Sequence, residues 1–149
     1  GKTIDQVFTK DELESALKLV VNQTQSCVFY NDGKGNFKMK SLPLMAQISP
    51  VFGSLVTDIN GDGINDILLG GNFYGLKPEL GRYDASYGIT LLGNKNGGYD
   101  YMKPLQSGLF VRGQVRDVKE IKATKGNYIL VARNNDSLQI FKKKNILLK

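Results

Sequence analysis

The sequence predicts an all-β fold of about three consecutive four-stranded antiparallel sheets, preceded by one helix near the N-terminus. From residue 25 onward, short strand-like runs alternate with turns rich in Gly and Asn. The pattern around residues 29–37 returns 62 residues later, and segments 55–70 and 114–131 resemble each other. Such repeats are typical of a β-propeller or another repeat array, in which each sheet buries its faces against its neighbours.

The first unit, residues 1–45, is predicted to be an incomplete sheet with a helix over residues 10–22. Thr9 and Glu12 form a capping box, and the apolar stripe that follows has helical spacing: Leu13, Ala16, Leu17, Val20 and Val21. We expect this stripe to pack on a sheet. Strands over 26–31 and 36–41 flank a hairpin turn at 32–35.

The middle unit, residues 46–105, is predicted to be one complete antiparallel sheet with the order strand, loop, strand, long loop, strand, hairpin, strand. The third unit, residues 106–149, follows the same order in a degenerate form, with a polar loop after Asp117. Because closed propellers need about four to eight sheets, three would leave both ends open. We therefore expect self-association, or packing against missing sheets of a longer parent chain.

The composition excludes several classes of protein. The chain has 149 residues, enough for a single domain, with one cysteine and no histidine. Intramolecular disulfides, Cys/His zinc sites and Ser-His or Cys-His nucleophiles are therefore excluded. Cys27 is expected to be a buried, unreactive thiol. No apolar run approaches the roughly 18 residues that span a bilayer, so the chain is not expected to cross a membrane.

The net charge of +6 is uneven along the chain, because residues 101–149 carry 11 basic and 3 acidic side chains. Such a surplus indicates either a surface that binds polyanions or a solvated sheet edge that resists aggregation. We favour the second interpretation, since only Lys142, Lys143 and Lys144 are contiguous. No specific nucleic acid is therefore expected as a partner.

The segment 58–66 carries the clearest chemical motif. Side-chain oxygens stand at its positions 1, 3, 5 and 9, a glycine stands at position 6, and position 7 offers a backbone carbonyl: Asp58, Asn60, Asp62, Asp66, Gly63 and Ile64. Alternate oxygens on a tight loop form a cage of the size that Ca²⁺ prefers, whereas Mg²⁺ demands a tighter octahedron. The sequence predicts a calcium site here.

The residues after this motif separate it from other calcium loops. An EF-hand would place a bidentate glutamate at position 12 on a helix, but Leu69 stands there within a strand-like run. The alternative to a calcium site is a plain turn of Asn-Gly and Asp-Gly type without an ion. A catalytic cation is disfavoured because the motif holds no base or nucleophile besides its own ligands.

Residues 52–72 resemble an FG-GAP repeat, the unit of integrin α-subunit propellers and of bacterial VCBS-type proteins, some of which have an ASPIC/UnbV-like region. Phe52-Gly53 matches the FG of that family, and Gly70-Gly71-Asn72 matches the GAP. The resemblance implies a calcium-bearing propeller blade, and it implies an exported protein that is extracellular, periplasmic or on the cell surface. It implies the ligands Asp58, Asn60, Asp62 and Asp66 with the Ile64 carbonyl.

The long loop 73–87 is the best candidate for recognition, because it combines aromatic faces with hydrogen-bonding groups. Its candidate residues are Tyr74, Arg82, Tyr83 and Tyr87. The alternative is that some of these tyrosines only cover the sheet.

Together these observations favour a non-catalytic, calcium-binding propeller segment for adhesion or protein–protein interaction, with a protein or glycan as ligand. The alternative is a carbohydrate-binding segment of a larger polysaccharide-processing protein.

Overall fold

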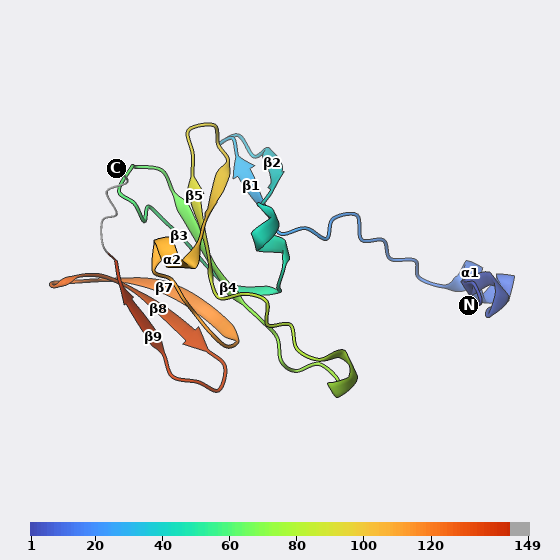
Figure 1. Cartoon of the computed structure of the whole chain (residues 1–149). Coiled ribbons are helices and arrows are strands. Elements are labelled where there is room, and N and C mark those ends of the chain that lie inside the picture. Colours follow the sequence, from blue (N-terminus) through green and yellow to red (C-terminus); the bar gives the residue numbers. More distant parts are fainter. Residues whose placement is uncertain (144–149) are drawn as a thin grey trace.

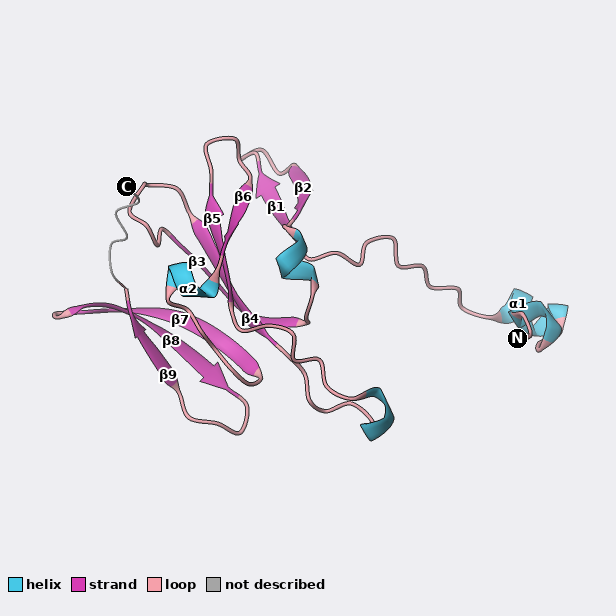
Figure 2. Ribbon diagram, viewed as in Figure 1, coloured by secondary structure: helices cyan, strands magenta, loops and turns pink. Residues whose placement is uncertain are grey.

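The computed structural model describes residues 1–143, and its main body consists of three antiparallel β-sheets with two, four and three strands (Figures 1 and 2). The strands are β1 Cys27–Asn31, β2 Phe37–Ser41, β3 Val51–Thr57, β4 Asp66–Gly71, β5 Ile89–Gly93, β6 Tyr99–Met102, β7 Val115–Ala123, β8 Gly126–Arg133 and β9 Gln139–Lys142. The helices are short: η1 Ile4–Gln6, α1 Lys10–Ser15, η2 Leu44–Gln47, η3 Pro78–Leu80 and α2 Pro104–Ser107. Among these residues, no helix is long and apolar enough to cross a lipid bilayer.

The middle sheet has the strand order β3-β4-β5-β6, with every neighbouring pair antiparallel. This confirms the four-stranded sheet predicted within residues 46–105. The hairpin of β1 and β2 also matches its prediction within one residue at each end. The third sheet contains β7, β8 and β9, and residues 144–149 of the predicted third unit lie outside the described residues.

The middle sheet has buried residues on both of its faces. Because side chains alternate along a strand, Ile67 and Leu69 of β4 belong to one buried cluster and Leu68 to another. The first cluster also contains Leu42 and Ala46, which follow β2, and the partly buried Val28 of β1 packs against it. The second joins the middle sheet to the third sheet through residues such as Val115, Val118 and Val131.

Glycines on β3 and β4 allow the third sheet to approach the middle sheet closely. A Cβ atom at Gly70 would lie 2.5 Å from Cγ1 of Val115, and one at Gly53 would lie 3.0 Å from Cα of Asp117. Real Cβ atoms do not tolerate the first of these distances, so β7 occupies the space that a side chain would need. The two glycines therefore have a packing role between the second and third sheets.

The predicted helix over residues 10–22 is wrong in its length. Thr9 and Glu12 do form the expected capping box, but α1 ends at Ser15, and Ala16 is already extended with φ −76° and ψ 137°. Figure 1 shows α1 at the end of a long tether, away from the sheets. Leu17 and Val21 are 84% and 76% exposed. Without a sheet to pack against, a short helix with β-branched residues gains too little to extend.

The polar loop predicted after Asp117 is also wrong. Strand β7 continues to Ala123, and β8 begins at Gly126, so the strands pair almost to their ends around a tight turn.

The expected burial of Cys27 is only partly met, because this free thiol is half-buried.

Candidate functional site

The acidic loop 58–66 joins the end of β3 to the start of β4, and Asp58 organises its first half. The amide of Gly61 donates to Oδ1 of Asp58 at 2.7 Å, and that of Gly63 donates to Oδ2 at 2.9 Å. These two glycines have φ of 82° and 83°, a region that other residues rarely adopt. The pKa of Asp58 lies below its ordinary value. The hydrogen bond from the Gly63 amide is the main cause, burial acts against it, and the hydrogen bond from the Gly61 amide lowers the pKa further.

The side chains of Asn60 and Asp62 accept hydrogen bonds from backbone amides in the outer part of the loop. The Oδ1 of Asn60 accepts from the amide of Asp62 at 3.1 Å, and the Oδ1 of Asp62 accepts from the amide of Ile64 at 2.8 Å. The two side chains also contact each other, because Nδ2 of Asn60 donates to Oδ2 of Asp62 at 3.0 Å. Each of these oxygens therefore has a partner within the loop.

Asp66 forms the base of the loop and is fully buried, with 0% of its surface exposed. Its Oδ2 accepts from the amide of Ile59 and its Oδ1 accepts from the amide of Gly93, both at 2.8 Å. The carboxylate thus ties the loop to the end of β5. Burial raises the pKa of Asp66 above its ordinary value, against the effect of these two hydrogen bonds.

The donor set fits a hard divalent cation in residue type and order. Ca²⁺ takes oxygen ligands, and a carboxylate or amide oxygen that accepts one N–H keeps a second lone pair for a cation. Within residues 1–143, however, no three Cys, Asp or Glu side chains are grouped closely enough to hold an ion. Binding at this loop would therefore require Asn60 and Asp62 to exchange their mutual hydrogen bond for contacts with the ion.

A half-buried ion pair of the third sheet lies next to the acidic loop and is linked to the middle sheet through Thr57 of β3. Nζ of Lys143 lies 3.2 Å from Oε1 of Glu120, and the hydroxyl of Thr57 donates to Oε2 of Glu120 at 2.7 Å. Burial alone would raise the pKa of Glu120, but the hydrogen bonds from Thr57 and Lys143 outweigh it and hold the pKa below its ordinary value. Thr57 directly precedes Asp58, so this pair fixes the start of the loop.

The recognition loop 73–87 leaves the sheet as a narrow ribbon that carries η3 at its tip (Figure 1). Phe73 and Tyr83 pair across the ribbon, with backbone hydrogen bonds of 2.8 and 2.9 Å. The guanidinium of Arg82 lies 4.9 Å from the centre of the Tyr74 ring, a cation–π contact. Tyr83 is 51% exposed.

Tyr87 does not join the contact between Tyr74 and Arg82. Its ring stacks on Phe110, with centroids 5.0 Å apart and planes at 8°, and Arg112 lies over the Phe110 ring at 5.4 Å. Sequence reasoning did not identify Phe110 and Arg112, because they follow α2 in an irregular segment far from the loop. The backbone amide of Val111 donates to the carbonyl oxygen of Tyr87, and this hydrogen bond brings the two segments together.

Comparison of the chain with protein-family models, curated proteins and solved structures gave no match. The function is therefore proposed from the chemistry and geometry of the chain's own residues.

Proposed function

We propose that this chain is a non-catalytic, calcium-stabilised segment of a β-propeller in an exported or surface protein, where it serves adhesion or protein–protein interaction. The observation that carries the proposal is the acidic loop between β3 and β4. Four side chains with oxygen ligands follow the spacing of a calcium loop, and three of them are carboxylates: Asp58, Asn60, Asp62 and Asp66.

The environment of the loop supports a structural role for the ion. Asp66 is hydrogen-bonded both to Ile59 and to Gly93, so a cation held near it would act on the ends of β3, β4 and β5 together. Three carboxylates confined to one short loop repel each other, and a divalent cation reduces this repulsion. The packing of both faces of the middle sheet against its neighbours supports the propeller assignment.

In this proposal, Asp58, Asn60, Asp62 and Asp66 hold Ca²⁺ together with the carbonyl oxygen of Ile64. The ion supplies charge neutralisation and a cross-link within the sheet. Because a bidentate glutamate at position 12 is missing, the expected dissociation constant is that of extracellular modules, about 10⁻⁴–10⁻³ M.

Calorimetric titration tests the proposed site. Ca²⁺ should bind the wild-type protein with one site per chain and Mg²⁺ should bind more weakly, whereas Asp62→Ala should abolish binding. Asp84→Ala is the matched control, because it removes one exposed carboxylate from the recognition loop instead. Equal loss of binding in both variants, or no saturable heat with Ca²⁺, would refute the site.

A second candidate function is carbohydrate binding, which the exposed aromatic side chains favour. Tyr74 with Arg82, and Tyr87 with Phe110 and Arg112, present rings beside cationic groups. Aromatic faces of this kind stack on sugar rings, and the neighbouring polar groups provide hydrogen bonds.

A glycan array separates the two candidate functions. Binding to a glycan that is lost in Tyr83→Ala and Tyr87→Ala would favour the carbohydrate function, with Tyr128→Ala on the third sheet as the control. Failure to bind any glycan, together with Ca²⁺-dependent capture of one identified protein partner, would favour the adhesion function.

A further inference from the structure

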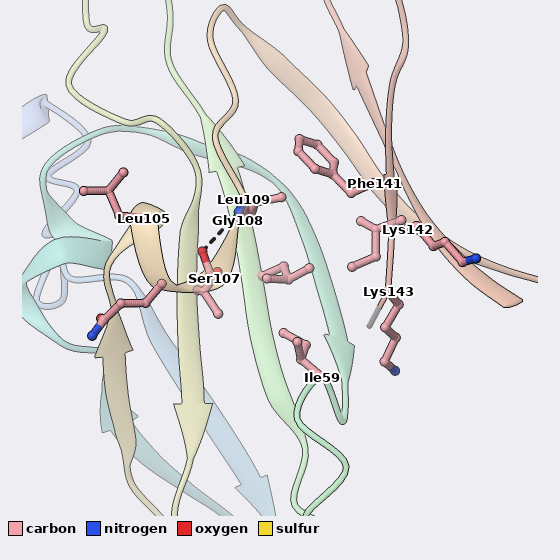
Figure 3. Close-up of a pocket in the computed structure, with 12 residues that line it drawn as sticks. Ile59, Leu105, Ser107, Gly108, Leu109, Phe141, Lys142 and Lys143 are labelled. Atoms are coloured by element: carbon pink, nitrogen blue, oxygen red, sulfur yellow. Dashed lines mark hydrogen bonds between the residues drawn. The ribbon is translucent and has the colours of Figure 1, made fainter. Parts of the chain in front are cut away.

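A cavity of about 400 Å³ lies between the middle and third sheets, next to α2 (Figure 3). Its volume falls within the range of about 300–1,000 Å³ that is common for small-molecule sites. The walls are mainly apolar, with side chains from the acidic loop, both sheets and the α2 region: Ile59, Leu68, Leu105, Leu109, Ile129 and Phe141. No part of this cavity belongs to the proposed calcium ligands.

One buried hydroxyl in the cavity wall has no partner. Thr90 lies opposite Leu68 in the pairing of β4 with β5, and only 2% of its surface is exposed. Within residues 1–143, its Oγ1 makes no hydrogen bond. A buried hydroxyl without a partner costs about 1–3 kcal/mol. Because Oγ1 is closed to a water-sized atom, a bound group recovers this loss once the Thr90 side chain rotates its hydroxyl toward the cavity.

Two other polar side chains of the cavity wall, Ser107 and Lys143, are already engaged. The hydroxyl of Ser107 accepts from the amide of Leu109 at 3.2 Å, the bond drawn in Figure 3. The ammonium of Lys143 is bound to Glu120 and Thr57, and that of Lys142 points away from the cavity (Figure 3). A lone water needs about two to four polar partners, and Thr90 alone cannot provide them.

One apolar side chain of the cavity lining is exposed to solvent. Leu105 lies in α2, and 99% of its surface is exposed, although it lines the cavity. An apolar molecule in the cavity would remove part of this side chain from water, which is favourable by about 25 cal/mol per Å². The site therefore favours an apolar body.

We propose that this cavity binds a small, neutral, largely apolar molecule that carries one hydrogen-bonding oxygen and directs it to Oγ1 of Thr90. Leu105 covers the bound molecule at the entrance. None of the proposed calcium-ligand side chains lines this site, although Ile59 of the same loop does.

Fluorescence titration of the full chain with 2-naphthol and with naphthalene tests the proposal. The two probes share the apolar ring system, and only 2-naphthol has a hydroxyl, so 2-naphthol should bind more tightly. Thr90→Val should weaken 2-naphthol binding about two- to ten-fold, the range of one net hydrogen bond, and should not affect naphthalene. Because the hydroxyl has no partner, Thr90→Val should also keep or raise the melting temperature.

Two further variants distinguish this cavity from general apolar adsorption. Leu105→Gln should weaken the binding of both probes without changing the melting temperature, whereas Leu80→Gln, on the exposed tip of the recognition loop, should change neither. Equal effects of these two variants, or 2-naphthol binding that is unchanged in Thr90→Val, would overturn the proposal. Binding that is seen only with a chain ending at Lys143 would overturn it as well, because the cavity would then belong to the chain's own last residues.

Discussion

The link between β3 and β4 and the link between β7 and β8 start from the same kind of sequence and take different courses. Leu55-Val56-Thr57-Asp58 precedes the first link, and Gln114-Val115-Arg116-Asp117 precedes the second. After Asp58 the strands separate, and the loop 58–66 is held by side-chain oxygens. After Asp117 the strands continue to pair up to Ala123 and Gly126.

The difference shows how closely spaced Asp and Asn residues change a β-hairpin. Asp and Asn side chains bond to nearby amides and so compete with the strand ladder, and Gly61 and Gly63 allow the backbone to turn. In the second link, Val118 and Ile121 favour a strand instead. In the middle sheet, strand pairing therefore stops before the loop, where side-chain oxygens bond to the backbone amides instead. A bound ion, as proposed, would compensate for the lost strand pairing.

The largest expected effect is at the buried base of the acidic loop. Asp66→Ala leaves the amides of Ile59 and Gly93 without their acceptor, and each buried unpaired amide costs about 1–3 kcal/mol. The free energy of unfolding, measured by urea denaturation, should fall by about 2–5 kcal/mol. The control is Asp117→Ala, at the position in the third sheet that corresponds to Asp58. Asp117 is only half-buried, so its substitution should lower the free energy of unfolding by less. Equal losses would contradict a special role for Asp66.

A smaller effect is expected at the turn of the same loop. Gly63 has φ 83°, and a Cβ atom there would meet no other atom within 4 Å. Gly63→Ala should therefore cost only the backbone strain, about 1–2 kcal/mol. The exposed neighbour Asn65 provides the control, because Asn65→Ala keeps the backbone of the turn. A shift in the urea midpoint for Asn65→Ala as large as that for Gly63→Ala would argue against backbone strain.

The smallest effect concerns the ion pair between Glu120 and Lys143, which contacts Thr57 of the middle sheet. Since the folded pKa of Glu120 is lowered from its usual value near 4.5, the carboxylate stabilises the fold above that pH, and this contribution is lost as the pH falls through the folded pKa. Between pH 6 and pH 3, the wild-type protein should therefore lose more stability than Glu120→Gln. Denaturant unfolding at the two pH values measures this. Parallel losses would mean that Glu120 does not contribute to the acid sensitivity.

The strand pattern was predictable because its signals are local. Turns rich in Asp, Asn and Gly at 32–35 and 94–98 mark hairpins, and the alternating apolar residues define the strands that pair across them. The calcium motif is equally local, since all its side chains lie within nine residues. The role of Asp66 in holding Gly93 could not be predicted, because it depends on the neighbouring strand β5.

The wrong helix length and the features that the sequence did not indicate depend on distant contacts. The apolar stripe 13–21 has a helical period, but its length as a helix depends on a sheet surface that it does not contact. The stacking of Tyr87 on Phe110 joins segments 23 residues apart without any periodic signal. The cavity around Thr90 is also a product of packing between sheets, and sequence alone does not indicate it.

Thermal unfolding in Ca²⁺, Mg²⁺ or a chelator, for the wild-type protein and Asp62→Ala, tests the central claim most directly. At a Ca²⁺ concentration about one hundred times the dissociation constant, binding should add about 2.7 kcal/mol and raise the wild-type melting temperature by about 5–10 °C. Asp62→Ala should melt at nearly the same temperature in all three solutions. A wild-type protein that melts at the same temperature in Ca²⁺ and in chelator would contradict the account.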